Sequence, residues 1–393
     1  MSKDTKETKP KAKKVPYYRR RDYYDYNLLA VVILLVAFGL VIMFSASVYD
    51  GTRYHNDNMY FLQRQAFFAV ISIVLVIVLP LLVDYHKLMG LAGGILYFGS
   101  LILMAMVRSP FGMEINGARR WINIKGISFQ PAELAKIAVI VIVPLAINYM
   151  GKKFRGFWAP VVALIIGGIP AAFAFFITSN LSTAIIIMMI TVVIVFVAYP
   201  KIMPFIVVAI IGAGATFFGV MRIANSVSVG NFRFMRILVW LDPEKYSDTG
   251  GHQIMQGLYA MGSGGFFGKG LGNSMQKLGA VPEAMNDMVF SILCEELGVF
   301  GVIIVLLLFV YLLYRLFFIA QNAPDLYGAL VVTGIFGHVA LQVILNISVA
   351  INLIPTTGIT MPFISYGGTA LCFLMVEIAI AQSVARSIKL KSK

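Results

Sequence analysis

Residues 27–48, NLLAVVILLVAFGLVIMFSASV, contain no charged side chain. A helix rises about 1.5 Å per residue, so this stretch can cross a hydrocarbon core of about 30 Å. Similar apolar stretches recur along the chain, and 59% of its 393 residues are hydrophobic while only 13% are charged. This composition excludes a soluble globular domain and predicts an all-α polytopic membrane protein.

About ten transmembrane helices are predicted from apolar windows of roughly 17 to 25 residues. One long polar interruption, predicted to be a large extracytoplasmic loop, separates the seventh helix from the eighth. The predicted spans are 27–48, 66–83, 91–107, 131–150, 157–178, 182–199, 202–221, 287–316, 326–350 and 362–385. The chain thus divides into a basic tail (1–26), helices one to seven (27–221), the extracytoplasmic loop (222–286), helices eight to ten (287–385) and a C-terminal tail (386–393).

Lysine and arginine concentrate in the two tails. Because cytoplasmic flanks retain positive charge, both termini are predicted to be cytoplasmic. The formal net charge of +14 therefore indicates contact with anionic lipid and no nucleic-acid partner. The two cysteines, Cys294 and Cys372, fall inside predicted helices, so no disulfide framework or CxxC metal site is indicated.

Two outer loops have patterns that predict local structure. In the loop 222–286, NFRFMRILVWLDP predicts a helix lying in the membrane interface, and HQIMQGLYAMGSGGFFGKGLGNS predicts a helix ended by a glycine-rich turn. The fragment GSGGFFGKG is no Walker phosphate loop, which would need Gly at Ser263 and Ser or Thr at Gly270. The last outer loop, NLIPTTGITMPFISYGG, is predicted to shape a pocket, because irregular backbone at membrane depth is buried or lines a cavity.

The stretch AVPEAMNDMVFSILCEELGVFG (residues 280–301) places acids at the mouth of the eighth span and inside it. Ionised groups in hydrocarbon are costly and normally have a partner or a function. If the helix begins just before Glu283, this residue shares a face with Asp287, which is then either a helix cap or a reactive carboxylate. Glu295 and Glu296 lie roughly 12 to 14 Å deeper. They are therefore predicted to pair with basic or polar groups and not to share a proton step with Asp287.

Other polar residues inside predicted spans have a structural explanation. Glu133 and Lys136 are three residues apart on one helix, so we expect them to neutralise each other, although Lys136 could instead border a path for an anionic headgroup. His338, Gln342 and Asn346 are spaced by four and form a polar stripe that is assigned to helix packing.

Four groups of motifs together resemble one family: GARRWI with QPAELAK, RILVWLDPEKY with GSGGFFGKGLGNS and QK, PEAMNDMVFSILCEELG, and PTTGITMPFISYGG. In these motifs and their order the chain is similar to the shape, elongation, division and sporulation (SEDS) glycosyltransferases FtsW, RodA and SpoVE. One segment departs from the family, which usually has a Pro-Asp-Leu-Gly-Thr type sequence where this chain reads SNLSTA (179–184). Thr360 within GITMPF resembles the FtsW/SpoVE branch more than the RodA-type elongation polymerase.

The resemblance implies a peptidoglycan glycosyltransferase of the bacterial plasma membrane that polymerises lipid II, the undecaprenyl-pyrophosphate disaccharide-pentapeptide, during cell division. It implies that Asp287 is the general base or the ligand of a divalent cation, Mg²⁺ or Mn²⁺, although no cofactor is established by the sequence. A departing pyrophosphate needs cations, and Arg120 and Lys277 are preferred because they stand in the resembling motifs. The other candidates for substrate binding are Arg119, Arg233, Arg236, Lys269, Glu283 and Ser365.

The resemblance also implies a class B penicillin-binding protein and other division proteins as partners. A lipid II flippase is the competing function, and a headgroup path would use Glu133, Lys136, Glu295, Glu296 and Glu377. A scaffold for division proteins is the third alternative and would make these acids dispensable. The location of the essential residues distinguishes the polymerase from the flippase. A polymerase depends on Asp287 at the outer surface, whereas a flippase depends on the residues at membrane depth.

Overall fold

The computed structural model describes residues 23–115, 118–124, 127–156, 158–224, 232–279 and 281–389, so most of the two predicted tails and part of the large loop lie outside the described residues. Nine helices in these ranges are long and apolar enough to cross a membrane, and α3 is apolar but shorter. The all-α membrane architecture predicted from the sequence is confirmed. The ten helices are α1 (Tyr26–His55), α2 (Tyr60–Leu82), α3 (Leu91–Met106), α4 (Pro131–Met150), α5 (Trp158–Phe176), α6 (Leu181–Ala198), α7 (Met203–Ala224), α10 (Val289–Asn322), α11 (Leu326–Ala350) and α12 (Gly368–Arg386).

The predicted helix ends differ from the observed ones where polar side chains offer the backbone other partners. The helix α12 begins at Gly368 and not at residue 362. The preceding segment stays irregular because the Met361 amide donates to the Ser365 hydroxyl at 2.8 Å and the Tyr366 amide donates to the Met285 carbonyl at 2.8 Å. These bonds replace the helical ones that a start at residue 362 would require.

Several connections between the membrane helices carry structure of their own. The large loop contains α8 (Phe232–Leu241), the short 3₁₀ helix η3 (Ser247–Thr249) and α9 (Gly251–Gly264), which confirms both helices predicted there. The connection between α3 and α4 forms an antiparallel sheet, β1 (Gly112–Ile115), β2 (Ala118–Ile124) and β3 (Ile127–Phe129), in the order β1-β2-β3. This sheet was not predicted, because strands this short carry little periodic signal in the sequence. Two 3₁₀ helices, η1 (Tyr85–Met89) and η2 (Gly151–Arg155), complete the connections.

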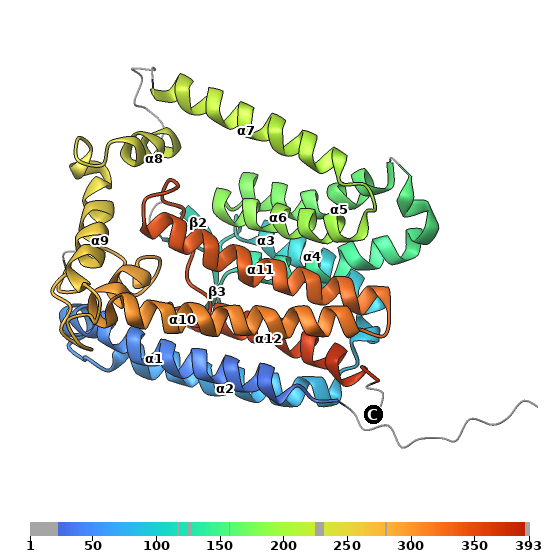
Figure 1. Ribbon diagram of the computed structural model, residues 1–393, viewed down its shortest axis with the longest axis horizontal. Helices are drawn as coiled ribbons and strands as arrows, with labels where there is room; N and C mark the ends of the chain where they lie inside the picture. Colours follow the sequence, from blue (N-terminus) through green and yellow to red (C-terminus); the bar gives the residue numbers. More distant parts are fainter. Residues whose placement is uncertain are drawn as a thin grey trace, which may run out of the picture.

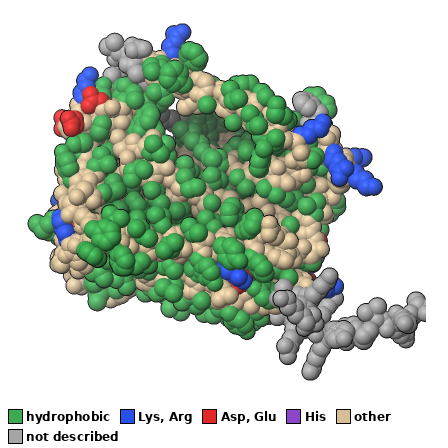
Figure 2. All heavy atoms as spheres, in the orientation of Figure 1, with side chains coloured by type: hydrophobic (Ala, Val, Ile, Leu, Met, Phe, Trp, Pro, Cys, Tyr) green, Lys and Arg blue, Asp and Glu red, His purple; other side chains and the backbone are tan. Residues whose placement is uncertain are grey.

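The apolar helices other than α7 lie side by side, with α8 and α9 at one end of the molecule and the end of α12 at the other (Figure 1). The helix α7 lies apart from them and contacts α8. The helix α12 packs against α2, α5 against α6, and α10 against α1, α9 and α11. The surface is largely apolar and its visible charged side chains lie mainly at the edges, while a hollow opens beneath α7 (Figure 2). This distribution is the one expected of a protein whose sides face lipid.

A buried ion pair joins the first helix to α10 at the end opposite α8 and α9. Arg315 donates from Nη2 to Asp25 Oδ2 at 2.6 Å and from Nε to the same oxygen at 3.1 Å. It also donates to the Tyr23 hydroxyl at 2.7 Å. Asp25 is fully buried and caps α1 by accepting from the Leu28 amide at 2.9 Å. One carboxylate thus fixes both a helix start and a helix–helix contact.

We predict that Arg315→Met lowers the free energy of unfolding by about 3 kcal/mol, because it leaves the buried Asp25 carboxylate without its cation. Thermal unfolding in detergent measures the change. Lys152→Met, at an exposed lysine of η2, is the control and should leave the melting temperature unchanged. Equal melting temperatures for the two variants would contradict the prediction.

Candidate active site

Asp287 lies in the turn that precedes α10, two residues before the first helical residue, Val289. The helix thus begins two residues after the predicted start of the span at residue 287, and the condition under which Asp287 would share a helix face with Glu283 is not met. Glu283 has a left-handed backbone with φ of 56°. Its carboxylate accepts a hydrogen bond from the Asn286 side chain, and its carbonyl accepts from the Asn286 amide at 2.9 Å. Glu283 thus orders the turn that carries Asp287.

Three successive carbonyl groups, those of residues 285–287, are held by other parts of the chain. The Tyr366 amide donates to the first at 2.8 Å and the Ser365 hydroxyl to the second at 2.6 Å. The side chain of Asn346 on α11 donates to the third at 2.9 Å and also to the Ile359 carbonyl at 2.8 Å. Asn346 belongs to the polar stripe that was predicted to serve helix packing, but its amide joins the last outer loop to the backbone of Asp287.

The carboxylate of Asp287 is half-buried beneath the helices of the large loop. Gln253 of α9 places its Nε2 atom 3.5 Å from Oδ1, at the limit of a hydrogen bond. Burial raises the pKa of Asp287 to about 7, the negative charge of Glu283 adds to this rise, and Arg236 opposes it. A carboxylate that titrates near neutral pH has the basicity that general base catalysis favours.

Arg236 of α8 is the cation that the structure places opposite Asp287. Its Nη1 atom donates to the Thr356 carbonyl at 3.2 Å. Burial lowers the pKa of the guanidinium, and the Asp287 charge raises it. One turn further along α8, Trp240 donates from Nε1 to the Asn352 carbonyl at 3.0 Å. These contacts bind α8 to the last outer loop and hold Arg236 over the site. The other arginine of this segment, Arg233, has its side chain outside the described residues.

The two lysines predicted to bind substrate are engaged elsewhere. Lys269 lies 2.7 Å from the buried Glu295 carboxylate, and Lys277 lies 2.8 Å from that of Glu296. Lys277 is only 8% exposed. The expectation that Glu295 and Glu296 pair with basic groups is thus confirmed. The preference for Lys277 as a phosphate ligand finds no support in this geometry, because its charge is already matched.

The two arginines of β2 differ in their surroundings. Arg119 is exposed and pairs with Glu114 at 3.4 Å. Arg120 donates from Nη2 to the Ser179 carbonyl at 3.0 Å, in the segment where the chain departs from its family. There Asn180 caps the N-terminus of α6 with its side chain. Arg120 therefore organises the connection between α5 and α6.

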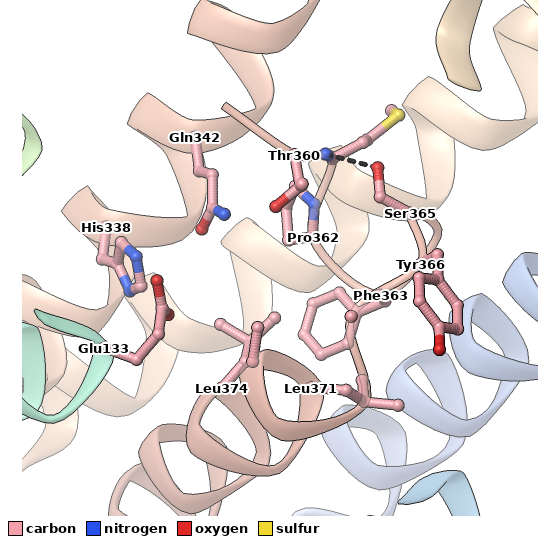
Figure 3. Close-up of a pocket in the computed structure, with 13 residues that line it drawn as sticks. Glu133, His338, Gln342, Thr360, Pro362, Phe363, Ser365, Tyr366, Leu371 and Leu374 are labelled. Carbon is pink, nitrogen blue, oxygen red and sulfur yellow. Dashed lines mark hydrogen bonds between the residues drawn. The ribbon is translucent and has the colours of Figure 1, made fainter. Parts of the chain in front are cut away.

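A small pocket lies behind the last outer loop, as the sequence predicted. Its wall is the same segment, residues 360–367, that Ser365 ties to the turn before Asp287. In Figure 3 the side chains of Gln342 and Thr360 point toward each other across the pocket, and Glu133 lies beside His338. The pocket is therefore polar on one side and adjoins the turn that carries Asp287.

Charged groups at the depth of the pocket occur in pairs. Lys136 lies 2.8 Å from Glu133 on the same helix, as their spacing predicted. His338 places Nδ1 2.7 Å from the Glu377 carboxylate, and both side chains are buried. Each of these acids thus has a partner within the protein at hydrogen-bond distance.

A resident divalent cation does not fit the side chains present. Within the described ranges, no group of three or more His, Cys, Asp or Glu side chains is arranged to hold a metal ion. Asp287 faces the guanidinium of Arg236 and the Nε2 group of Gln253, and neither of these nitrogen groups is a ligand for a divalent cation. We therefore derive no step through a metal at this site.

The fold and the site define a multi-pass membrane protein with a half-buried carboxylate just before the start of a transmembrane helix. Residues 25–390 match the family of cell cycle proteins formed by FtsW, RodA and SpoVE. The chain belongs to this family.

Relatives of known name support this assignment over nearly the whole chain. Stage V sporulation protein E of Bacillus subtilis is 34% identical over 92% of this chain and 97% of its own length. A probable peptidoglycan glycosyltransferase FtsW of Trichlorobacter lovleyi is 34% identical over 93% and 94%.

Solved structures agree with this fold. A chain from "Structural coordination of polymerization and crosslinking by a peptidoglycan synthase complex" is 26% identical, covers 92% of this chain and 98% of its own, and has a TM-score of 0.74. The rod shape determining protein RodA of Thermus thermophilus is 27% identical, covers 94% of this chain and 98% of its own, and has a TM-score of 0.64.

We predict that Asn346→Leu loosens the turn before α10, because two carbonyl groups lose their donor at a cost of about 1–3 kcal/mol each. Hydrogen exchange measures the effect as faster exchange at residues 285–289 and 359–366. Asn322→Leu, at an exposed asparagine near the end of α10, should leave these segments unchanged. Unaltered exchange in the Asn346 variant would show that the amide does not hold the turn.

Proposed function

We propose that this protein is a peptidoglycan glycosyltransferase that polymerises lipid II, with Asp287 as the general base. The observation that carries the proposal is the half-buried Asp287 carboxylate, whose pKa is raised to about 7, facing Arg236 at the outer mouth of α10. Membership of the FtsW, RodA and SpoVE family supports it, as do relatives named peptidoglycan glycosyltransferase.

In the proposed reaction, Asp287 accepts the proton of the acceptor sugar's hydroxyl group. The hydroxyl oxygen forms a bond to the anomeric carbon of the donor sugar, and the bond from that carbon to the pyrophosphate oxygen breaks. Pyrophosphate leaves as an anion, so no acid is needed to protonate it. Arg236 is placed to stabilise this negative charge as it develops. One carboxylate and one guanidinium therefore supply what the transfer requires.

The charges at membrane depth favour a polymerase over a flippase. A path for a charged headgroup would need polar groups available to the substrate, whereas Glu133, Glu295, Glu296 and Glu377 each have a partner within hydrogen-bond distance. These pairs account for the acids structurally. The reactive carboxylate instead lies at the outer mouth of α10.

The stage of wall synthesis and the protein partners are proposed from the similarity to relatives. The matches to Stage V sporulation protein E and FtsW support a role in septal or sporulation wall synthesis. The concentration of Lys and Arg in the two tails supports a cytoplasmic location for both termini. A structural neighbour comes from a peptidoglycan synthase complex. We accordingly propose a class B penicillin-binding protein as partner, together with other division proteins. Most of the basic tail, residues 1–22, lies outside the described residues, so no role is proposed for it.

We predict that Asp287→Ala and Asp287→Asn each lower glycan-strand synthesis from purified lipid II by at least about 100-fold, because both remove the base. Synthesis is measured in liposomes with the partner protein present, and thermal unfolding verifies that the variants fold. Normal polymerisation by the folded variants would remove Asp287 from the mechanism. A wild-type protein that makes no polymer but moves labelled lipid II across the bilayer would favour the flippase.

We predict that the rate rises with pH through about 7, because only the ionised Asp287 accepts a proton and burial raises its pKa to about 7. Arg236→Gln should move this acid limb to higher pH, since Arg236 lowers the pKa of Asp287. The pH–rate profile of polymerisation measures both. A limb that stays in place in the Arg236 variant would contradict the proposed pairing.

A further inference from the structure

The helix α10 is broken at Gly298, where φ is 65° and ψ is −169°. The glycine-rich segment that follows α9, residues 265–279, fills the break. Two of its amides donate to the carbonyls of residues 295 and 296 at 2.9 Å each. Beyond the break, the amides of residues 299 and 300 donate to carbonyls of the same segment at 3.1 and 3.0 Å. The hydrogen bonds that the break would leave open in hydrocarbon are thereby made.

Side chains reinforce this contact through two ion pairs, Lys269–Glu295 and Lys277–Glu296, which we call the clasp. Glu295 also accepts hydrogen bonds from a hydroxyl and from amides of the glycine-rich segment. Lys277 donates to the Ser45 hydroxyl of α1 at 2.7 Å as well as to Glu296. The clasp thus fixes the end of the large loop to α10 and α1 at once.

Between Asp287 and the break, α9 lies directly along the outer part of α10. Its start contacts Asp287 through Gln253. A Cβ atom on Gly257 would lie 2.4 Å from the Met288 side chain, and one on Gly264 would lie 2.1 Å from the carbonyl oxygen of residue 294. The two segments therefore touch along their length, with glycine at the closest approaches. The clasp begins five residues after the end of α9.

We propose that Glu295 and Glu296 are positioning residues for Asp287, and that they act through α9. The clasp holds the end of α9 against α10, and this fixes the start of α9 over the carboxylate. The inference rests on the proposed role of Asp287 as base. It gives the acids inside the helix a function that requires no contact with substrate.

The clasp acts by position and not by its own electric field. Each of its carboxylates is neutralised by a lysine, and Glu295 lies roughly 12 Å along the helix from Asp287. The charged groups that face Asp287 are Arg236 of α8 and Glu283 of the preceding turn. A looser α9 would admit water around Asp287. The carboxylate would then be better solvated and would titrate at lower pH.

Two changes release the end of α9 in different ways. Lys269→Met removes one cation but leaves Glu295 with its hydroxyl and amide donors, so the variant should fold. Gly264→Ala pushes α9 away from the α10 backbone. The matched control is Gly262→Ala on the same helix, where an added Cβ meets nothing within 4 Å. Arg315→Met controls for lost stability, because it breaks a buried ion pair at the far end of α10.

The test measures the titration of the Asp287 carboxyl by infrared difference spectroscopy against Asp287→Asn, together with the pH–rate profile of polymerisation. We expect Lys269→Met and Gly264→Ala to shift both the titration and the acid limb to lower pH by about one unit or more. Lys269→Arg should restore the wild-type values. Gly262→Ala and Arg315→Met should leave them unchanged.

The infrared measurement separates this inference from the proposed function, because it needs no catalysis. If the wild-type protein fails to polymerise lipid II but the carboxyl titration shifts as expected, the clasp positions Asp287 and the proposed reaction is wrong. If folded Lys269→Met and Gly264→Ala proteins titrate like wild type, the clasp is only structural and the inference is overturned. A shift in Arg315→Met as large as that in Lys269→Met would overturn it as well.

Discussion

The cost of an unpaired charge in hydrocarbon governs where this chain can place its acids. Every glutamate at membrane depth named here has a partner, from the same helix for Glu133, from α11 for Glu377 and from the large loop for Glu295 and Glu296. Asp287 differs because it lies outside the helix, in the turn before α10, where Arg236 of α8 lies near its carboxylate. A carboxylate that is buried in this way has a raised pKa, and it therefore accepts a proton more readily near neutral pH.

The sequence alone predicts the membrane helices, but it does not predict which side chains contact one another around the site. Apolar windows define membrane helices because the bilayer imposes their length, and charges inside a window must find partners. Which lysine would pair with Glu296 could not be read from spacing, because Lys277 reaches it only after the glycine-rich segment turns back onto α10. Asn346 was misassigned for a similar reason, since a polar stripe looks the same whether its amide binds another helix or the carbonyl of a distant turn.

The segment that departs from the family retains its structural role by other means. Asn180 caps α6 where the family usually has Asp, and both residues cap helices well, so the substitution removes a charge and keeps the cap. Ser182 stands where the family usually has Gly, and its hydroxyl donates to the Thr357 carbonyl. The next residue, Gly358, approaches the Asp287 carboxylate so closely that an added Cβ would lie 3.9 Å from Oδ2. The departure therefore ties α6 to the wall of the site.

The turn that carries Asp287, the proposed base, is ordered locally by Glu283 and is held in place by segments that are distant in sequence. The Asp287 carbonyl is bound by α11, the carbonyls before it by the last outer loop, and its carboxylate is covered by α9. Residues in a free turn would sample many conformations, and fixing them costs roughly 1–2 kcal/mol each. Contacts from both the large loop and the transmembrane bundle offset this cost. Because both parts surround Asp287, a movement of either one changes the hydration of its carboxylate. Substrate or partner binding that moves α8 or α9 would consequently alter the strength of the base without contacting it.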